Sequence, residues 1–166
     1  MTFADIANGE SVFVDANTFV YHFVPHPGFK AACESLLERI GRQELTGFTS
    51  ADVLSDVAHR TMTLEAASIF GWPVAGISQR LRKHPAEIPK LNNYRQAVHA
   101  VPQMGIRVLP ATLDLVLSAA DMSQKYGLLS GDALVVATML AHGLKNLASH
   151  DADFDRVTGI TRFAPA

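Results

Sequence analysis

Short apolar runs alternate with longer amphipathic segments along most of the chain. The first run, Val12 to Val14, does not alternate with polar residues, which is typical of a strand covered on both faces. Similar runs predict further strands, and Arg162-Phe163 is expected to close the sheet. The predicted strands cover residues 11–14, 45–48, 106–109 and 146–148.

Helical periodicity predicts helices between these strands. Thr49-Ser50 and Ser130 are expected to cap two of them. The helix over 112–125 should bury a face that carries Leu113, Val116, Leu117 and Ala120. The predicted helices cover residues 17–23, which Pro25 would end, 29–40, a segment after Ser50, 73–83, 91–104, 112–125 and 131–142.

This order of elements predicts an α/β fold, a three-layer α/β/α sandwich with a mainly parallel central sheet. A length of 166 residues is ordinary for one domain, so we expect residues 1–166 to form a single unit. Ligands of such folds gather at the carboxyl ends of the strands. Polar residues that directly follow a strand are therefore candidates for the functional site.

Composition limits the ways in which the chain could bind a nucleic acid. The formal net charge is -2 and only 18% of residues are charged, so there is no global basic field. An RNA would need local basic groups or bound cations. Cys33 is the one cysteine and falls on an apolar helix face, which indicates a core position. The first residues do not resemble a signal peptide and no apolar run is long enough to span a membrane, so we expect a cytoplasmic protein.

Four aspartates occupy positions that the strand-end rule highlights. Asp15 and Asp151 follow predicted strands, Asp132 lies in the first turn of a helix, and Asp56 lies in the helix after Ser50. Each has an ordinary interpretation as a turn residue, a helix-dipole partner or, for Asp56, a partner of Arg60. Four carboxylates at one edge of a sheet would repel one another unless they shared a cation. Together they indicate a metal site.

Oxygen ligands alone favour Mg²⁺ or Mn²⁺ over zinc. Such an ion can polarise a phosphoryl oxygen, lower the pKa of a water and stabilise the leaving oxygen of a phosphodiester. His22 and His26 are four residues apart, but Pro25 lies between them, so a zinc site there is not expected.

The ordered set of motifs resembles the PIN-domain family, most closely the VapC-type toxin ribonucleases of bacterial toxin–antitoxin pairs. The motifs are VFVDANTF, TSADVLSDVAHR, LLSGDALVVA and NLASHDADF. The resemblance covers nearly the whole chain. It implies that the protein cleaves RNA, binds a cognate antitoxin protein and pairs with a second copy as a homodimer.

The same resemblance assigns roles to individual residues. It implies that Asp15, Asp56, Asp132 and Asp151 are the catalytic metal-binding acids. Asn17 and Ser149 would support them as neighbouring polar groups, and Asp153 would be an additional acid that acts directly or through water. One position departs from the family, because Asp56 stands where glutamate is usual. The shorter side chain would bring the metal closer to that helix or act through water.

Basic residues offer a second, weaker set of candidates. Arg80, Arg82 and Lys83 form a cluster that could steer an RNA backbone, and Arg60 could contact a phosphate if Asp56 does not bind it. The cluster is equally consistent with a solvated helix end, where cations are favoured.

Two other functions remain open. A haloacid-dehalogenase-type phosphatase would use Asp15 as nucleophile, but the expected second aspartate is Asn17. A catalytically silent PIN-like module that binds RNA or protein would explain both the aspartate at position 56, where the family usually has glutamate, and the absence of a global basic charge. A dinucleotide-binding enzyme is excluded because no G-x-G-x-x-G follows the first strand.

Overall fold

A parallel five-stranded sheet lies at the centre of the computed structural model, which describes residues 1–24 and 28–166. The strand order is β3-β2-β1-β4-β5, and every pair in it is parallel. The strands are β1 (Ser11–Val14), β2 (Thr46–Ser50), β3 (Arg107–Leu109), β4 (Asn146–Ala148) and β5 (Thr161–Phe163). The predicted α/β fold with a mainly parallel sheet is confirmed.

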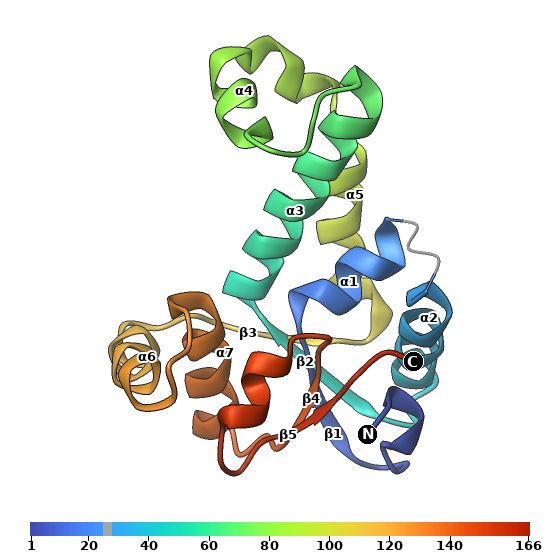
Figure 1. The fold of residues 1–166 in the computed structure, drawn as a ribbon. Helices are drawn as coiled ribbons and strands as arrows, with labels where there is room; N and C mark the ends of the chain where they lie inside the picture. Colours follow the sequence, from blue (N-terminus) through green and yellow to red (C-terminus); the bar gives the residue numbers. More distant parts are fainter. Residues whose placement is uncertain (25–27) are drawn as a thin grey trace.

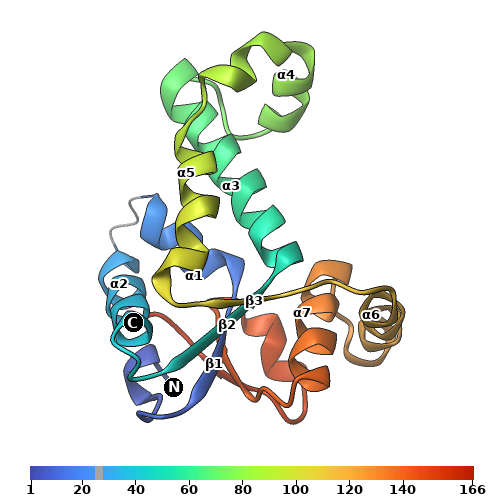
Figure 2. The same cartoon turned by 180° about the vertical axis from the view of Figure 1, so that it is seen from behind.

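Helices cover the sheet from both sides, with α1 and α2 on one side and α6 and α7 on the other (Figures 1 and 2). Val12, Phe13 and Val14 are therefore fully buried, which explains why their strand does not alternate. The α-helices are α1 (Ala16–Phe23), α2 (Lys30–Gly41), α3 (Ala51–Phe70), α4 (Ile77–Lys83), α5 (Asn93–Ala100), α6 (Leu113–Tyr126) and α7 (Ser130–Ala141). The 3-10 helices are η1 (Phe3–Asp5), η2 (Pro85–Lys90), η3 (Val101–Met104) and η4 (Ala152–Arg156).

An arm extends from this body and consists of the distal half of α3 together with α4, η2 and α5 (Figures 1 and 2). Helix α3 has 20 residues and is thus about 30 Å long. The arm has a small core of its own around Ala66, Ile77, Leu81 and Leu91. Trp72 packs against Phe70 beside this core, with ring centroids 4.8 Å apart. Both aromatic residues thus belong to the packing of the arm.

The helices of the arm are shorter than the periodicity predicts. Helix α4 begins only at Ile77, after Gly76 in a left-handed conformation at φ 73°. Helix α5 ends at Ala100, because Pro102 lacks the amide proton that would continue it and residues 101–104 tighten into η3. Pro25 and His26 lie outside the described residues.

Two helix details also differ from expectation. Ser130 is the first residue of α7, and Leu129 occupies the N-cap position. Ser50 does occupy the N-cap of α3, but its hydroxyl makes no capping hydrogen bond. The hydroxyl of Thr49 instead donates to the carbonyl of Val14. The serines at positions 50 and 130 therefore predicted where both helices begin, but neither helix has the predicted capping hydrogen bond.

The apolar face of α6 that was expected to be buried is exposed instead. Leu113, Val116 and Leu117 are 72%, 49% and 60% exposed, and Ala120 is also exposed. The opposite face packs inward through Leu115 and Ala119. Leu113, Val116, Leu117 and Ala120 thus form an uncovered apolar stripe, hereafter the α6 stripe.

Cys33 is buried in the main core as predicted, and burial raises the pKa of its thiol to about 12. A thiol that keeps its proton in this way is unreactive. Within residues 1–24 and 28–166, no helix has the length and apolar character needed to cross a membrane.

Candidate active site

The carboxyl edge of the sheet brings distant parts of the chain together. Val14 of β1 lies beside Ala148 of β4, and the amide of Asp15 donates to the Ala148 carbonyl at 3.1 Å. Asp15 therefore emerges next to residues 149–151. Because α7 runs back to β4, its first turn, with Asp132, also lies at this edge.

Asp15 is the most enclosed of the four predicted acids, with 9% of its surface exposed. It is the N-cap of α1, where Oδ1 accepts a 2.7 Å hydrogen bond from the amide of Ala16. Oδ2 accepts from the Ser149 hydroxyl at 2.7 Å and from the Asn17 amide. Burial raises the pKa of Asp15 to about 6 and outweighs these hydrogen bonds. The carboxylate is held in place by these hydrogen bonds, and the positive charge of Arg60 lowers its pKa only in part.

Asn17 and Ser149 connect the ends of β1 and β4. The Asn17 amide nitrogen also donates to the Ser149 hydroxyl at 2.9 Å, and its oxygen accepts from the amide of His150 at 3.0 Å. Ser149 in turn accepts from the amide of Asp151 at 3.1 Å. These contacts place both polar residues directly beside Asp15, at the positions that the motifs indicate.

Asp15, Asp56 and Asp132 line one hollow of about 540 Å³, hereafter the acidic hollow. Burial raises the pKa of Asp132, and the negative charges of Asp151, Asp153 and Asp56 raise it further. Asp132 in turn raises the pKa of Asp15. Asp132 therefore lies within electrostatic range of the other three predicted acids, and Asp151 is the one of the four that does not line the hollow.

The donor set of this hollow suits a hard divalent cation. Its charged groups are carboxylates, and their mutual repulsion would be relieved by a positive ion. Among the described residues, no three acidic, histidine or cysteine side chains stand close enough to enclose an ion directly. Mg²⁺ keeps several waters and needs only one or two direct carboxylates, so the residues fit a partly hydrated ion.

Sequence reasoning missed Asp52, which lines the same hollow. Its Oδ1 is buried and has no hydrogen-bond partner in the described part of the chain. Asp52 lies four residues before Asp56, and this spacing places both on one face of α3. That spacing was the signal in the sequence, but an acid in a first helical turn is usually only a dipole partner.

Asp151 and Asp153 begin the short helix η4. Asp151 caps it by accepting from the Asp153 amide at 2.9 Å. The Asp153 carboxylate forms an ion pair with Arg156 at 2.6 Å. Asp151 therefore keeps one carboxylate oxygen outside this capping contact, whereas the carboxylate of Asp153 is already paired with the guanidinium of Arg156.

The predicted basic residues lie in two different places. Arg60 lies one turn after Asp56 without forming an ion pair with it, and its charge lowers the pKa of Asp15 and Asp132. Arg80, Arg82 and Lys83 lie on α4 at the far end of the arm (Figure 1). The structure therefore places Arg60 within electrostatic range of Asp15 and Asp132, although it does not line the acidic hollow, and leaves the α4 cluster away from both.

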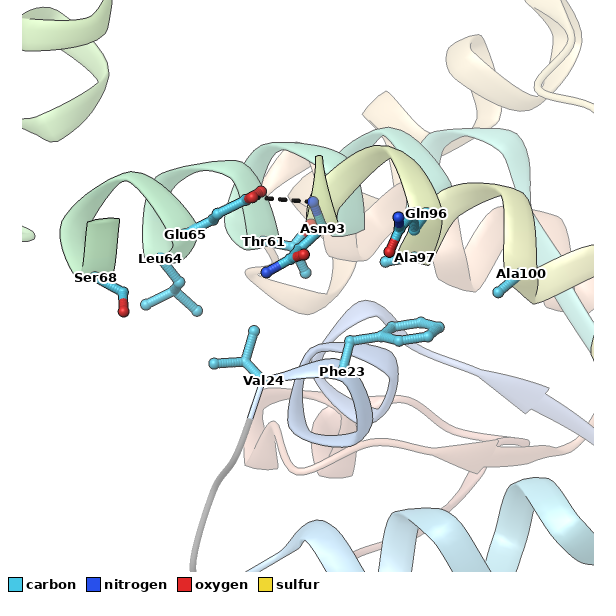
Figure 3. A pocket seen from close by; sticks show the side chains of 10 residues that line it. All are labelled: Phe23, Val24, Thr61, Leu64, Glu65, Ser68, Asn93, Gln96, Ala97 and Ala100. Atoms are coloured by element: carbon cyan, nitrogen blue, oxygen red, sulfur yellow. Dashed lines mark hydrogen bonds between the residues drawn. The ribbon is translucent and has the colours of Figure 1, made fainter. Parts of the chain in front are cut away.

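A second hollow, of about 510 Å³, lies between α1, α3 and α5 (Figure 3). Its one acid is Glu65, whose carboxylate accepts from the amides of Asn92, Asn93 and Tyr94 at 2.9 to 3.1 Å. These amides belong to the start of α5, where a negative charge is stabilised. Glu65 therefore joins α3 to α5.

Comparison with known proteins agrees with this geometry. The PIN-domain family matches over residues 12–160. Ribonuclease VapC2 of Methanocaldococcus jannaschii is 26% identical over 149 residues, which cover 88% of each chain. The crystal structure of Mycobacterium tuberculosis VapC20, a toxin that cleaves the sarcin–ricin loop, superposes with a TM-score of 0.60 at 18% identity, covering 90% of this chain and 96% of that one.

The VapBC2 complex of Rickettsia felis, crystallised with a DNA fragment from its promoter, gives a TM-score of 0.59 at 13% identity, over 94% of this chain and 99% of the matching one. These crystal structures support the fold, and the match over residues 12–160 leaves the phosphatase alternative without support. The resemblance found in the sequence is confirmed: the chain belongs to the PIN-domain family.

Proposed function

We propose that the protein is a metal-dependent endoribonuclease of the VapC type that hydrolyses RNA phosphodiester bonds with Mg²⁺ or Mn²⁺. The observation that carries this proposal is that Asp15, Asp56 and Asp132 line one hollow and that Asp132 is electrostatically coupled to Asp15, Asp56 and Asp151. Acids so arranged favour the binding of a divalent cation, and the bound cation can in turn attract the anionic phosphodiester. The similarity to Ribonuclease VapC2 supports the same activity.

In this mechanism Asp15, Asp56, Asp132 and Asp151 would hold the cation, in part through its bound waters. When bound, the cation polarises the phosphoryl group and acidifies an attacking water. Asn17 and Ser149 keep the Asp15 carboxylate oriented through their hydrogen bonds to Oδ2. Asp153 acts at a distance, because Arg156 pairs with it. Each of these acids therefore supports phosphodiester hydrolysis without being consumed in it.

Arg60 supplies the substrate contact nearest to the acids. Its guanidinium is exposed, makes no ion pair with Asp56 and lies within electrostatic range of Asp15 and Asp132. A guanidinium can bind two phosphate oxygens at once. Arg80, Arg82 and Lys83 would meet only a longer RNA that reaches the end of the arm.

The test compares wild type with Asp15→Asn and Asp132→Asn on a mixed RNA pool, with Mg²⁺, with Mn²⁺ and with EDTA. We expect cleavage only with a metal and a loss of about 100- to 1000-fold in each variant. Asp121→Asn is the matched control, because Asp121 is exposed on α6. Cleavage that persists in EDTA or in both variants would contradict the proposal. RNA binding without any cleavage would identify a catalytically silent PIN module instead.

We further propose a cognate antitoxin partner, a homodimer and action in the cytoplasm. The matched crystal structures include toxin–antitoxin assemblies. The α6 stripe is an exposed apolar surface that a second copy would cover. Light scattering should show a dimer for wild type and a monomer for Leu117→Lys, whereas a monomeric wild type would refute the dimer. Growth arrest on expression, relieved by a neighbouring small gene, would distinguish a toxin from a housekeeping nuclease.

A further inference from the structure

The end of the arm is a basic part of an otherwise acidic chain. Residues 71–95 contain five of the 14 lysines and arginines but only one of the 16 aspartates and glutamates, Glu87. Glu87 pairs with Lys90 at 2.7 Å, so the segment has no further acid for its other cations. Positive charge is therefore concentrated at the end of the arm, away from the sheet (Figure 1).

Three of these basic side chains line one hollow of about 410 Å³, hereafter the basic hollow. Arg80, Lys83 and His84 are three and four residues apart, a spacing that places them on one face of a helix. Arg82 does not line the hollow. The lining residues are Ala75, Gly76, Gln79, Arg80, Lys83 and His84.

Trp72 supports two of the side chains that line the basic hollow. The guanidinium carbon of Arg80 lies 5.5 Å from the centroid of the Trp72 ring, and the His84 ring lies 5.8 Å from it. A guanidinium stacked on a ring keeps its N–H donors in its own plane, free for an anion. Because Trp72 restrains Arg80 before a ligand arrives, less conformational entropy is lost on binding.

The donors of Arg80 and Lys83 have no acceptor within residues 1–24 and 28–166. Other cations of these residues are paired with carboxylates. The pairs are Lys30–Glu34, Arg39–Glu44, Arg42–Glu38, Arg156–Asp153 and Arg162–Asp155. The helix dipole attracts cations to the end of α4, but it explains neither the shared hollow nor the aromatic support. These features together indicate a site for an anion.

We propose that the basic hollow binds a backbone phosphate of the RNA substrate at a distance from the cut, so that the arm is a second anchor for long RNA. This inference rests on the proposed ribonuclease function. A guanidinium binds two phosphate oxygens at once, and an ammonium adds a point charge. Five cations beside one acid exceed what a single phosphate needs, so the segment suits a chain of phosphates. Phosphate contacts do not read bases, so this anchor selects the length of the RNA and not its sequence.

Helix α3 sets how far the RNA must reach. The segment from Asp56, which lines the acidic hollow, to Phe70, the last residue of α3, spans about 21 Å at 1.5 Å per residue. A strand that rises about 3.4 Å per nucleotide needs about six nucleotides to cover this distance. An RNA that ends closer to the cut reaches the acids but not the anchor.

The first test measures Kd for an RNA of about 30 nucleotides by fluorescence anisotropy in EDTA, which withholds the metal. Each neutralised phosphate contributes about 0.7 to the slope of log Kd against log salt, or about fivefold in Kd at 0.1 M. Arg80→Gln/Lys83→Gln should therefore raise Kd about 5- to 25-fold and lower the slope by about 0.7 to 1.4. Lys125→Gln/Lys145→Gln removes two exposed cations outside the arm and should change Kd less than about twofold. Equal losses in the two double variants would overturn the inference.

A single variant guards against a disturbed arm. Lys83→Glu leaves Arg80 on Trp72, so it should keep the melting temperature of wild type while weakening RNA binding more than Lys83→Gln does. If Lys83→Glu binds the long RNA as tightly as wild type, the inference is wrong.

The second test compares two substrates with the same cut, one with about 15 nucleotides on each side and one with about two. In Arg80→Gln/Lys83→Gln, KM for the long substrate should rise about 5- to 25-fold, while kcat and the KM of the short substrate stay within about threefold. An equal loss on both substrates would place the effect at the acids or in the fold and would overturn the anchor.

Competing anions and separate readouts distinguish the remaining outcomes. Displacement of the RNA by micromolar inorganic phosphate would identify a small-anion site, and equally tight binding of polyglutamate through the same residues would identify a site for an acidic protein; both contradict the inference. If wild type cleaves RNA and Arg80→Gln/Lys83→Gln keeps its Kd, the anchor fails and the ribonuclease stands. If wild type binds long RNA through the basic hollow but never cleaves it, the ribonuclease fails and the anchor stands.

Discussion

In the described part of the chain two carboxylates are buried, Asp15 at the sheet edge and Glu65 in the arm, and they are similarly enclosed but serve different ends. They are 9% and 8% exposed, and each accepts three hydrogen bonds. Glu65 receives its hydrogen bonds from three backbone amides at a helix start. Asp15 receives two from side chains and lies beside another acid, Asp132.

The difference shows how position decides the use of a buried charge. Glu65 fills the amide positions that a helix leaves open, so its charge stabilises the arm. Asp15 is a carboxylate whose pKa burial raises to about 6, so its ionised form is unfavourable in the metal-free protein. A folded chain retains such a charge where a ligand compensates for it.

Removing Glu65 should give the largest effect on stability. Glu65→Ala leaves three amides without their acceptor, and we expect it to lower the free energy of unfolding by about 3–5 kcal/mol. Glu65→Gln retains one carbonyl oxygen and should lose about half as much. Urea denaturation measures both. A loss below about 1 kcal/mol in Glu65→Ala would show that water replaces the carboxylate and that α5 does not depend on it.

Removing the charge of Asp15 should raise the free energy of unfolding, the opposite of the effect expected for Glu65. The rise of its pKa from 3.8 to about 6 corresponds to about 3 kcal/mol of destabilisation above pH 6. The folded state binds the proton more tightly, so this cost develops as pH rises from 4 to 6 and is absent below both values. Because Asn17 loses an acceptor at any pH, we expect Asp15→Asn to gain about 2 kcal/mol at about pH 7.5 and to lose about 1 kcal/mol at about pH 4.

The measurement is urea denaturation in EDTA at both pH values, with Asp121→Asn as the matched control. The sign is the critical result. A variant that is less stable than wild type at neutral pH would mean that the hydrogen bonds of Asp15 outweigh its burial, and the contrast with Glu65 would disappear.

The sequence predicted the acids at the sheet edge because local rules place them. Asp15 follows β1 directly, and all parallel strands end at the same edge of the sheet. The position of Asp15 at that edge could therefore be predicted without knowing the strand order. Glu65 could not be predicted in the same way. Its partners are the amides of residues 92–94, and they meet it only because the arm folds back on α3. No pattern near Glu65 encodes that return.

The α6 stripe shows a second limit of pattern reasoning. Leu113, Val116 and Leu117 have helical spacing and therefore predict a buried face. The structure buries the opposite face through Leu115 and Ala119. Periodicity identifies an apolar face without saying whether its own chain or another chain covers it. In the same way, the cations of α4 were visible in the sequence but their distance from the acids was not.

Adding a divalent metal should stabilise the protein through the acidic hollow and leave the contribution of the arm unchanged. If the cation binds the acidic hollow, Mg²⁺ or Mn²⁺ at tenfold excess over its Kd should stabilise wild type by about 1.4 kcal/mol. Glu65→Gln should gain the same amount, because the arm lies outside the hollow, and Asp132→Asn should gain much less. Thermal melts with and without EDTA measure these shifts. An equal gain in Asp132→Asn would place the ion elsewhere.

The smallest expected effect concerns the residue that departs from the family. Asp56 is exposed and lines the acidic hollow, so a longer side chain there has room to extend. We expect Asp56→Glu to lower the metal Kd about threefold, because the added methylene lets the carboxylate reach a partly hydrated ion. Titration calorimetry with Mn²⁺ measures this change. Asp121→Glu makes the same substitution on the exposed surface of α6 and should leave Kd unchanged. A weaker Kd in Asp56→Glu alone would mean that the ion already sits close to α3 and that the shorter aspartate fits it better.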